Sequence, residues 1–492
     1  MRAVFTGSYP HIMPAPFLRL VATLGLLSVL ALPSHASNLA QFSPKLVKAM
    51  QQHKLPADAL SLAIVPLDGP GQARFIGADV PLNPASTMKL VTTYAALELL
   101  GPTHRWATRL YTLGTLNGDT LQGDLYLQLG GDPKLTQERL WLLLRDLRSA
   151  GIKHVSGRLL LDSSHIRPNV GQSFKDDGND PSRPFLVDAD SLLVNFKSLR
   201  VDVRTRSGQS FVSIEPPLAN VQVDNAVQVK PASTCPRWPA LRFETQDQGQ
   251  QARIRVVGSL PNGCLAQHYV SLLDHASYTS ALLRALWQEL GGSIGGENGL
   301  VASIPPGAQL LAYSQSEDVA TVIRDINKFS NNTMARQLFY GIGAQFRQAG
   351  DAHDGDAAER VIQQWFRSKQ ISPQALVMEN GSGLSRIERI SARQMANMLQ
   401  SAWQSPYAAE FIASMPLAGM DGTLRRRLRG TAVEGQAHMK TGSLNNVRAL
   451  AGYTRDAKHH TWAVVAIINH PRPWGASQIL DTVVEEVHRQ AR

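Results

Sequence analysis

Apolar positions recur along the chain either at every second residue, as in strands, or every three to four residues, as in helices. The balance of the two periods differs between parts of the chain. Between residues 105 and 262, apolar and polar residues alternate in short runs separated by Gly, Pro, Asn and Asp. Such runs are typical of strands joined by tight turns. One stretch among them, 138–151, has the helical period instead. The region is therefore predicted to be rich in strands.

The chain on either side of this region combines helix and strand patterns. The helical period of apolar residues predicts helices at 83–101, 278–292, 319–343, 358–370, 391–404 and 477–492. Shorter apolar runs predict strands at 60–67, 73–78, 438–443, 447–456 and 460–470. The last three strands should be antiparallel neighbours, because only a few residues separate them, and the final helix should pack across them.

These patterns predict an α+β fold with more than one domain. The chain has 492 residues, and a single hydrophobic core stops growing at roughly 250 to 300 residues. We expect a discontinuous α+β domain made of 37–103 and 275–492, interrupted by an inserted, strand-rich part at 104–274. Within that insertion, a nested β subdomain is expected at about 190–262.

The first 36 residues have the features of a secretory signal peptide. Arg2 and Arg19 flank its first half, the apolar run LVATLGLLSVLAL follows, and Ser34 and Ala36 are the small residues that a cleavage site requires. We expect cleavage after Ala36. The mature protein should be soluble and exported, because the apolar run is shorter than the roughly 20 residues of a membrane span.

Charge and cysteine content narrow the choice of partners. The formal net charge is +10, and loss of the two leader arginines leaves +8. Export makes nucleic acid an unsuitable partner, whereas an anionic envelope surface fits this charge, and peripheral association with the envelope stays open. The only two cysteines, Cys235 and Cys264, are expected to form one structural disulfide in an oxidising compartment, and they lack the spacing of a metal site.

Two polar residues stand at the start of the predicted helix 83–101. Ser86 and Lys89 are three positions apart, so they share one helix face and the amine can reach the hydroxyl. An amine whose pKa is lowered by desolvation beside another cation can accept the proton of such a hydroxyl. The pair is a candidate nucleophile and base, although Ser-x-x-Lys also occurs by chance.

Two further polar motifs follow in order. Ser330-Asn331-Asn332 lies in a predicted helix-to-loop stretch and offers a hydroxyl and an amide. Lys440-Thr441-Gly442-Ser443 lies in a predicted strand and offers a cation, two hydroxyls and a Gly that permits close backbone approach. Each motif alone could be a turn or a strand end. Their order after Ser86 favours a joint catalytic site.

With these three motifs the sequence resembles the serine acyltransferases of the penicillin-binding protein and serine β-lactamase superfamily, which use SxxK, SxN and KTG in this order. Within it, the chain is similar to the class C low-molecular-mass penicillin-binding proteins, the D-Ala-D-Ala carboxypeptidase/endopeptidase family. The long insertion between SxxK and SxN is a hallmark of that family. Further similar segments are 125–135, Asn327-Lys328, 380–386 and 415–424. The resemblance implies a penicillin-binding transpeptidase domain, in which helices flank an antiparallel sheet.

Three places depart from the pattern of that family. Asn380 stands where an Asp usually precedes Gly-Ser-Gly, and Arg336 stands where a Glu often follows the SxN motif. The loop 172–189 lacks an expected aromatic-rich sequence. These departures concern the choice of substrate more than the chemistry.

The resemblance implies a periplasmic serine DD-peptidase that acts on peptidoglycan stem peptides. It would cleave D-Ala-D-Ala and peptide cross-bridges through an acyl-enzyme on Ser86, with Lys89 as base, and β-lactams would inhibit it. Ser330 would relay a proton between Lys89 or the catalytic Lys440 and the leaving amine, and Asn332 would hold the substrate amide. No metal or organic cofactor is implied. The residues implied in binding the terminal carboxylate are Lys440, Thr441, Gly442 and Ser443.

Asp162 is the expected substrate contact within the insertion. In the resembling family, a carboxylate at the end of the corresponding strand faces the cleft and can meet the free amino group of a diamino acid. Asp162 ends a predicted strand in which Leu159 and Leu161 alternate with Leu160. The alternative interpretation is an Asp that caps the following turn.

Two other functions stay open on the sequence alone. A serine β-lactamase or esterase would use the same fold, but no residue outside the three motifs supplies a dedicated deacylating base. A non-catalytic peptidoglycan-binding protein would have kept the cleft without its reaction, but every reactive residue is present. Turnover of a D-Ala-D-Ala peptide, turnover of a cephalosporin and binding to sacculi would separate the three functions.

Overall fold

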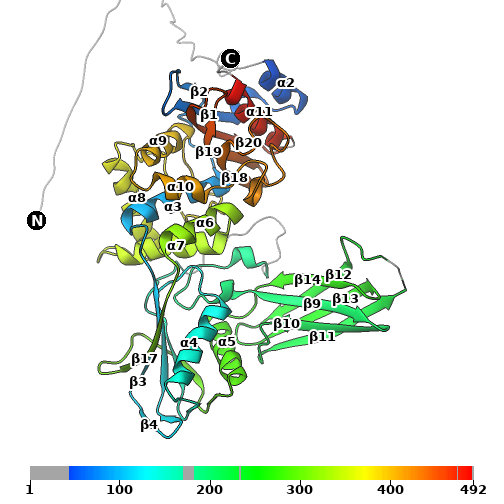
Figure 1. Cartoon of the computed structure of the whole chain (residues 1–492), viewed down its shortest axis with the longest axis vertical. Helices are drawn as coiled ribbons and strands as arrows, with labels where there is room; N and C mark the ends of the chain where they lie inside the picture. Colours follow the sequence, from blue (N-terminus) through cyan, green and yellow to red (C-terminus); the bar gives the residue numbers. More distant parts are fainter. Residues whose placement is uncertain (1–43, 170–181, 232–233, 474, 490–492) are drawn as a thin grey trace, which may run out of the picture.

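The computed structural model describes residues 44–169, 182–231, 234–473 and 475–489. The expected leader, 1–36, and residues 172–181 of the loop 172–189 lie outside these ranges. Figure 1 shows two bodies: a main body of helices around one sheet, and an inserted body below it that carries a long β lobe to one side. The main body comprises residues 44–104 and 317–489, and the inserted body comprises the described residues between them.

The main body is built on a five-stranded antiparallel sheet. Its order is β18 (Ala437–Leu444), β19 (Val447–Arg455), β20 (Thr461–Asn469), β1 (Leu60–Pro66) and β2 (Arg74–Ile76). The prediction that the last three strands of the chain are antiparallel neighbours is confirmed. β20 is buried along nearly its whole length, because helices cover both faces of the sheet.

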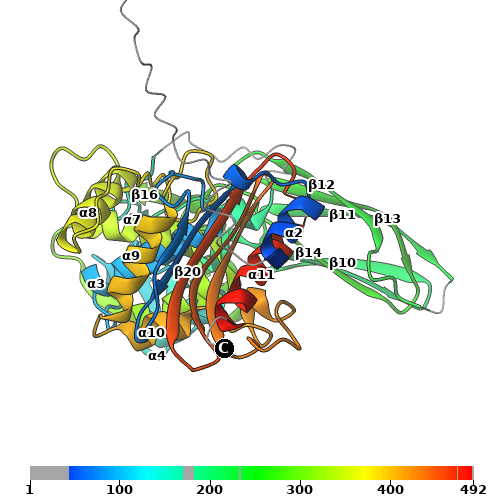
Figure 2. The ribbon, with the colours of Figure 1, turned by 90° about the horizontal axis from the view of Figure 1, so that it is seen from above.

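Two layers of helices enclose this sheet, and Figure 2 shows the strands running between them. On one face, α11 (Ala476–Arg489) packs against β19 and β20, as predicted for the final helix, and α2 (Pro44–Gln52) packs against α11. On the other face lie α3 (Lys89–Leu99), α6 (Val319–Phe329), α7 (Asn332–Gln345), α8 (Asp354–Ser368), α9 (Ala392–Trp403) and α10 (Ala408–Ser414). Because α3 is surrounded by the sheet and its neighbouring helices, even its first residue, Lys89, is buried.

The inserted body has its own sheets and its own core. The main sheet has the order β16 (Asn298–Val301), β8 (Leu159–Asp162), β6 (Leu125–Leu129), β3 (Ala107–Thr112) and β17 (Gln309–Gln315). A smaller sheet has the order β15 (Ser293–Ile294), β7 (His154–Val155), β5 (Thr120–Gln122) and β4 (Thr115–Asn117). The helices α4 (Gln137–Ser149) and α5 (His275–Glu289) supply apolar side chains to the same core as these strands.

The expected end of the insertion at residue 274 is wrong. Tyr278, Leu282 and Leu283 of α5 are fully buried in the core of the inserted body, and β17 pairs antiparallel with β3. The chain therefore returns to the main body only after β17. There Ser316 and Trp106, in the two segments that connect the bodies, exchange hydrogen bonds. The helical period identifies a helix at 278 but does not reveal which core its apolar face joins.

The β lobe consists of two three-stranded sheets. One has the order β10 (Gln209–Glu215), β9 (Leu199–Arg206) and β14 (Leu265–Val270); the other has the order β11 (Val221–Lys230), β13 (Ala252–Pro261) and β12 (Ala240–Asp247). The lobe thus continues to residue 270, past the expected limit of about 262, because β14 pairs with β9. Among the described residues, no helix is both long enough and apolar enough to cross a membrane.

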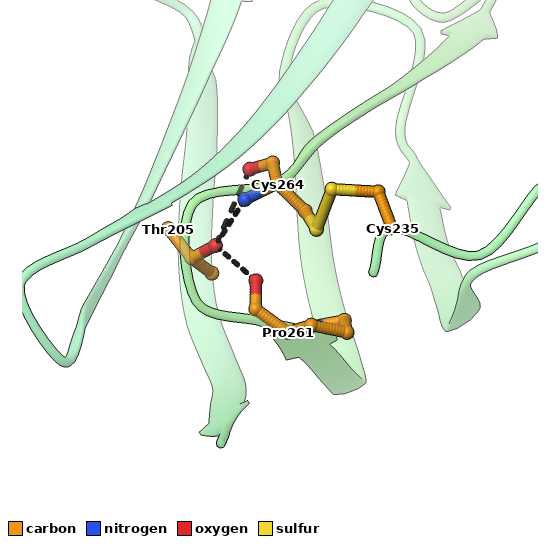
Figure 3. The surroundings of a disulfide bond; sticks show 4 residues. All are labelled: Thr205, Cys235, Pro261 and Cys264. Carbon is orange, nitrogen blue, oxygen red and sulfur yellow. Dashed lines mark hydrogen bonds between the residues drawn. A yellow bond between two sulfur atoms is a disulfide. The ribbon is translucent and has the colours of Figure 1, made fainter. Parts of the chain in front are cut away.

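A disulfide joins Cys235 and Cys264 in this lobe, as expected from the sequence. It connects the segment between β11 and β12 to the turn that enters β14. Figure 3 shows Thr205 of β9 beside it, where the hydroxyl accepts a hydrogen bond from the amide of Cys264 and donates to the carbonyl of Pro261. The covalent bond and these hydrogen bonds fix the turn against β9.

Candidate active site

Ser86 lies on a single 3₁₀ turn, η2 (Ala85–Met88), that leads directly into α3. The turn is held from the sheet side, because Asn469 at the end of β20 exchanges two hydrogen bonds with the backbone of Asn83, at 3.0 and 2.9 Å. The side chain of Asn83 in turn accepts from the amide of Ala85 at 2.9 Å. The Ser86 side chain is only half-buried, so its hydroxyl is accessible at the end of the helix.

Two glycines allow the chain to approach this turn closely. A Cβ on Gly442 of β18 would lie 2.6 Å from the carbonyl oxygen of Pro84, and one on Gly383 would lie 1.9 Å from that of Ala85. Gly383 also has a φ of +77°, which side chains rarely adopt. The strand that carries Lys440 and the loop that contains Ser382 therefore both contact the segment that carries Ser86.

Lys89 is fully buried, and its amine connects three segments of the main body. The Nζ atom donates to Ser86 Oγ at 3.1 Å, to Asn332 Oδ1 at 2.6 Å and to the carbonyl oxygen of Ser382. Within the described part of the chain, no carboxylate forms an ion pair with this amine. The prediction that Lys89 can reach the hydroxyl of Ser86 is therefore met by the geometry.

Ser330 and Asn332 lie where α6 ends and α7 begins. Ser330 has a left-handed backbone conformation with φ +57°, which ends α6, and the side chain of Asn331 caps α7 by accepting from the amide of Met334. This tight junction places Asn332 on the first turn of α7, next to Lys89. Asn332 Nδ2 also donates to the carbonyl of Phe185, in the described part of the loop 172–189.

Lys440 is the second fully buried amine of the site. Its Nζ donates to Ser330 Oγ at 2.8 Å and to the carbonyl oxygen of Thr441 at 2.8 Å. On the next position of β18, Thr441 Oγ1 lies 2.8 Å from Thr423 Oγ1, and Ser443 is exposed. The site therefore contains two amine–hydroxyl pairs, which are Lys89 with Ser86 and Lys440 with Ser330.

Burial makes both amines easier to deprotonate. It is the main cause that lowers the pKa of Lys89 well below its usual value, and the charges of Lys440 and Arg336 lower it further, while Glu388 opposes them. Burial also lowers the pKa of Lys440, to about 7. A neutral Lys89 can accept a proton from Ser86, which an exposed lysine cannot do at neutral pH.

Several residues that the motifs do not include contribute to the geometry. Asn83 and Asn469 fix the turn of Ser86, Ser382 supplies a carbonyl to Lys89, and Thr423 contacts Thr441. Ser382 lies within 380–386 and Thr423 within 415–424, so the segments similar to the resembling family did mark these two. The contact between Asn83 and Asn469 spans 386 positions and leaves no local pattern.

The structure contradicts the expectation that Asp162 faces the cleft. Its side chain is buried, Oδ2 accepts from Gln128 Nε2 at 2.9 Å and Oδ1 accepts from the amide of Ser164 at 2.9 Å. The partners lie within the inserted body, and the contact with Ser164 is the turn cap of the alternative interpretation. Asp162 stands opposite Gln128 in the register of β8 and β6, which explains why its carboxylate is used within the sheet.

No group of three or more His, Cys, Asp or Glu side chains in the described ranges is arranged to hold a metal ion. The chemistry of the site can be carried by its own hydroxyls and amines. Ser86 offers a nucleophile, Lys89 a base, and Lys440 with Ser330 a second path for a proton.

Comparison with known proteins identifies relatives over most of the chain. The profile of the D-Ala-D-Ala carboxypeptidase 3 (S13) family matches residues 43–486. A D-alanyl-D-alanine carboxypeptidase of Actinomadura is 29% identical over 76% of this chain and 70% of its own length. The D-alanyl-D-alanine carboxypeptidase DacB of Haemophilus influenzae is 27% identical over 78% of this chain and 80% of its own length.

Solved structures show the same fold. Penicillin-binding protein 4 of Haemophilus influenzae superposes with a TM-score of 0.75 at 22% identity, over 91% of this chain and all of that structure. The predatory endopeptidase Bd0816 of Bdellovibrio bacteriovorus superposes with a TM-score of 0.51 at 14% identity, over 88% of this chain and 93% of that structure. The predicted α+β fold of the penicillin-binding type is confirmed.

Proposed function

Because this chain belongs to the D-Ala-D-Ala carboxypeptidase 3 (S13) family of serine peptidases, we propose that Ser86 is its nucleophile and Lys89 its base. The observation that carries this proposal is the buried amine of Lys89, which lies 3.1 Å from Ser86 Oγ and has a lowered pKa. The family membership makes the chain a D-Ala-D-Ala carboxypeptidase. The assignment of roles to individual residues is our own.

In the first step, Ser86 Oγ attacks the carbonyl carbon of the penultimate D-Ala and its proton passes to Lys89 Nζ. The backbone amides of Ser86 and Ser443 stabilise the negative oxygen that forms, and each such donor contributes roughly 3 to 4 kcal/mol. The carbon–nitrogen bond then breaks, and the leaving amine takes a proton through Ser330. Water hydrolyses the resulting ester and returns Ser86 to its initial state.

Lys440 and its neighbours bind the end of the substrate. The terminal carboxylate of the acyl donor is placed against Lys440, Thr441 and Ser443, while Asn332 holds a substrate amide. This role for β18 is supported by the half-buried Thr441 and the exposed Ser443, which lie on the same face of the strand. Gly442 contributes by its size, since a side chain there would collide with Pro84.

Endopeptidase activity is proposed alongside the carboxypeptidase activity. A peptide cross-bridge presents a D-Ala carbonyl in an amide bond to another stem peptide, so the same acyl transfer would cleave it. β-Lactams imitate the acyl donor and are proposed to acylate Ser86. The features of residues 1–36 support export to the periplasm, where peptidoglycan stem peptides are available.

A labelled penicillin tests the assignment of the nucleophile. We expect the mature protein to carry one label on Ser86, located by peptide mass analysis, and Ser86→Ala to carry none. Label on a different serine, or label retained by Ser86→Ala, would show that the assignment is wrong. Muropeptide monomers and cross-linked dimers incubated with the parent protein then measure carboxypeptidase and endopeptidase activity separately.

A further inference from the structure

Glu388 is a buried carboxylate close to Lys89 and Arg336, and no motif includes it. It is fully buried, as are Lys89 and Lys440, and Arg336 is 2% exposed. Two lysine amines and one guanidinium are therefore buried in this region with one equally buried carboxylate. Glu388 is near enough to Lys89 and to Arg336 for its charge to affect the pKa of each.

The carboxylate of Glu388 organises the loop that precedes it. Its Oε1 atom accepts hydrogen bonds from three successive backbone amides, those of Glu379, Asn380 and Gly381, at 3.2, 3.0 and 2.9 Å. Its Oε2 atom is buried and has no hydrogen-bond partner among the described residues. One oxygen therefore fixes the loop, and the other carries uncompensated charge in the interior.

The loop fixed in this way holds the amine of Lys89. The carbonyl of Ser382, directly after the three amides, accepts from Lys89 Nζ. The carbonyl of Gly381 accepts from Thr92 Oγ1, one turn further along α3, at 2.6 Å. Gly383 then lies against Ala85 in the turn that carries Ser86. A shift of this loop would displace an acceptor of Lys89 directly.

We propose that Glu388 is a positioning residue for the reaction: it fixes the carbonyl that orients Lys89, and its negative charge counters the two cations nearest to that amine. The inference rests on the proposed role of Lys89 as base. It also accounts for one departure from the family pattern, since the usual Asp before Gly-Ser-Gly is Asn380 here. In this chain the carboxylate reaches the same loop from position 388.

Glu388 has the hydrogen-bond partners of a carboxylate, although burial opposes its charge. Burial and the charge of Glu379 favour the neutral form and raise the pKa of Glu388, whereas the three amides on Oε1 lower it. A protonated Glu388 would need an acceptor for its proton, and Oε2 has none among the described residues. The nearby Arg336 guanidinium also favours the charged form.

The charge of Glu388 contributes to the pH at which Lys89 becomes a base, after burial and the charge of Lys440. The groups that face Lys89 are Lys440 from β18 and Arg336 from α7, which lower its pKa together with burial, and Glu388, which raises it. Removal of the Glu388 charge should therefore lower the pKa of Lys89 further. The acidic limb of the acylation rate reports the protonation of the free base, so it should move to lower pH.

The experiment compares the pH dependence of penicillin acylation in the parent and three variants. Glu388→Gln keeps an oxygen for the three amides and removes the charge, whereas Glu388→Asp keeps the charge and shortens the reach. Glu379→Gln is the matched control, because it removes a carboxylate from the same loop that is only half-buried. Thermal unfolding of each variant is measured in parallel.

We expect the acidic limb of Glu388→Gln to move down by about 1 pH unit, the shift that one nearby charge produces. The limbs of Glu388→Asp and Glu379→Gln should stay within about a third of that shift. An unmoved limb in Glu388→Gln, or an equal shift in Glu379→Gln, would overturn the proposal. If Glu388→Gln does not fold, Glu388→Asp decides, because a shift of about 1 pH unit in this variant, which keeps the charge, would also overturn the proposal. A parent that is not acylated would refute the proposed function instead.

Discussion

The candidate site of the main body and the sheets of the inserted body differ in the charged groups that they bury. In the inserted body, the buried Asp162 and Asp202 use their oxygens for hydrogen bonds with neighbouring side chains or amides. In the main body, Lys89 and Lys440 are buried against hydroxyls, an amide and carbonyls. An amine buried without an ion pair is costly, and the described part of the main body retains two of them at the site. The difference marks where this protein gives up stability for chemistry.

The largest effect is expected from Lys89→Arg. Arginine keeps the positive charge but stays protonated, so it cannot accept the proton of Ser86. We expect penicillin acylation to fall by about 1,000-fold, within the range that general base catalysis contributes. The acylation rate should fall clearly less in Lys440→Arg than in Lys89→Arg. Acylation rates measured by mass spectrometry would contradict the assignment if Lys89→Arg stayed near the parent rate while Lys440→Arg did not.

Removal of the disulfide should have the opposite pattern: a large loss of stability and no change in the acylation reaction. Cys235 and Cys264 are 29 positions apart, and a closed loop of that length contributes about 3.6 kcal/mol to stability. The double variant Cys235→Ala/Cys264→Ala should unfold at lower temperature and keep the parent acylation rate at 25 °C. A matching loss of acylation would show that the β lobe supports the site.

Lys440→Met tests the stability cost of a buried amine. Folded Lys440 loses its proton near pH 7, whereas the unfolded chain keeps it up to about pH 10.4. Between these values the unfolded state binds more protons, so the parent's free energy of unfolding rises with pH. The loss in free energy of unfolding that comes from burying the charged amine of Lys440 is therefore complete below about pH 7. It is absent above about pH 10.4, where the amine is neutral in both states.

At pH 7 we expect the free energy of unfolding of Lys440→Met to exceed that of the parent by about 2 kcal/mol. This value is the relieved burial penalty less the contribution of the two hydrogen bonds that Met cannot make. The difference should shrink at pH 9.5. Denaturant unfolding at both pH values measures it, and Lys153→Met in the inserted body is the control. If the free energy of unfolding changes equally with pH in the parent and in Lys440→Met, the buried amine of Lys440 does not cause the pH dependence.

The same contrast explains what could be predicted from the sequence. Ser86 and Lys89 are local in sequence, so the helical period alone predicts that they meet. The assignment of α5 to the inserted body could not be predicted, because an apolar helix face does not show which of two hydrophobic cores it packs into. Glu388 was missed for a related reason: its role depends on three backbone amides, and backbone groups leave no trace in side-chain patterns.

The smallest effect is expected from Asp162→Asn. An Asn can still accept from the amide of Ser164, and the amide of Gln128 can turn to offer its oxygen to the new NH₂ group. The free energy of unfolding should therefore fall by about 1 kcal/mol or less, the value of one replaced hydrogen bond. Penicillin acylation should be unchanged, because the partners of Asp162 lie within the inserted body.

The decisive comparison for Asp162 uses two D-Ala-D-Ala peptides that differ only in the free amino group of the diamino acid. Asp162 is buried and each of its oxygens accepts a hydrogen bond within the inserted body, so the ratio of the two turnover rates should be the same in Asp162→Asn and in the parent. A loss confined to the peptide with the amino group would place Asp162 in the cleft, and the inserted body would then also bury charge for chemistry.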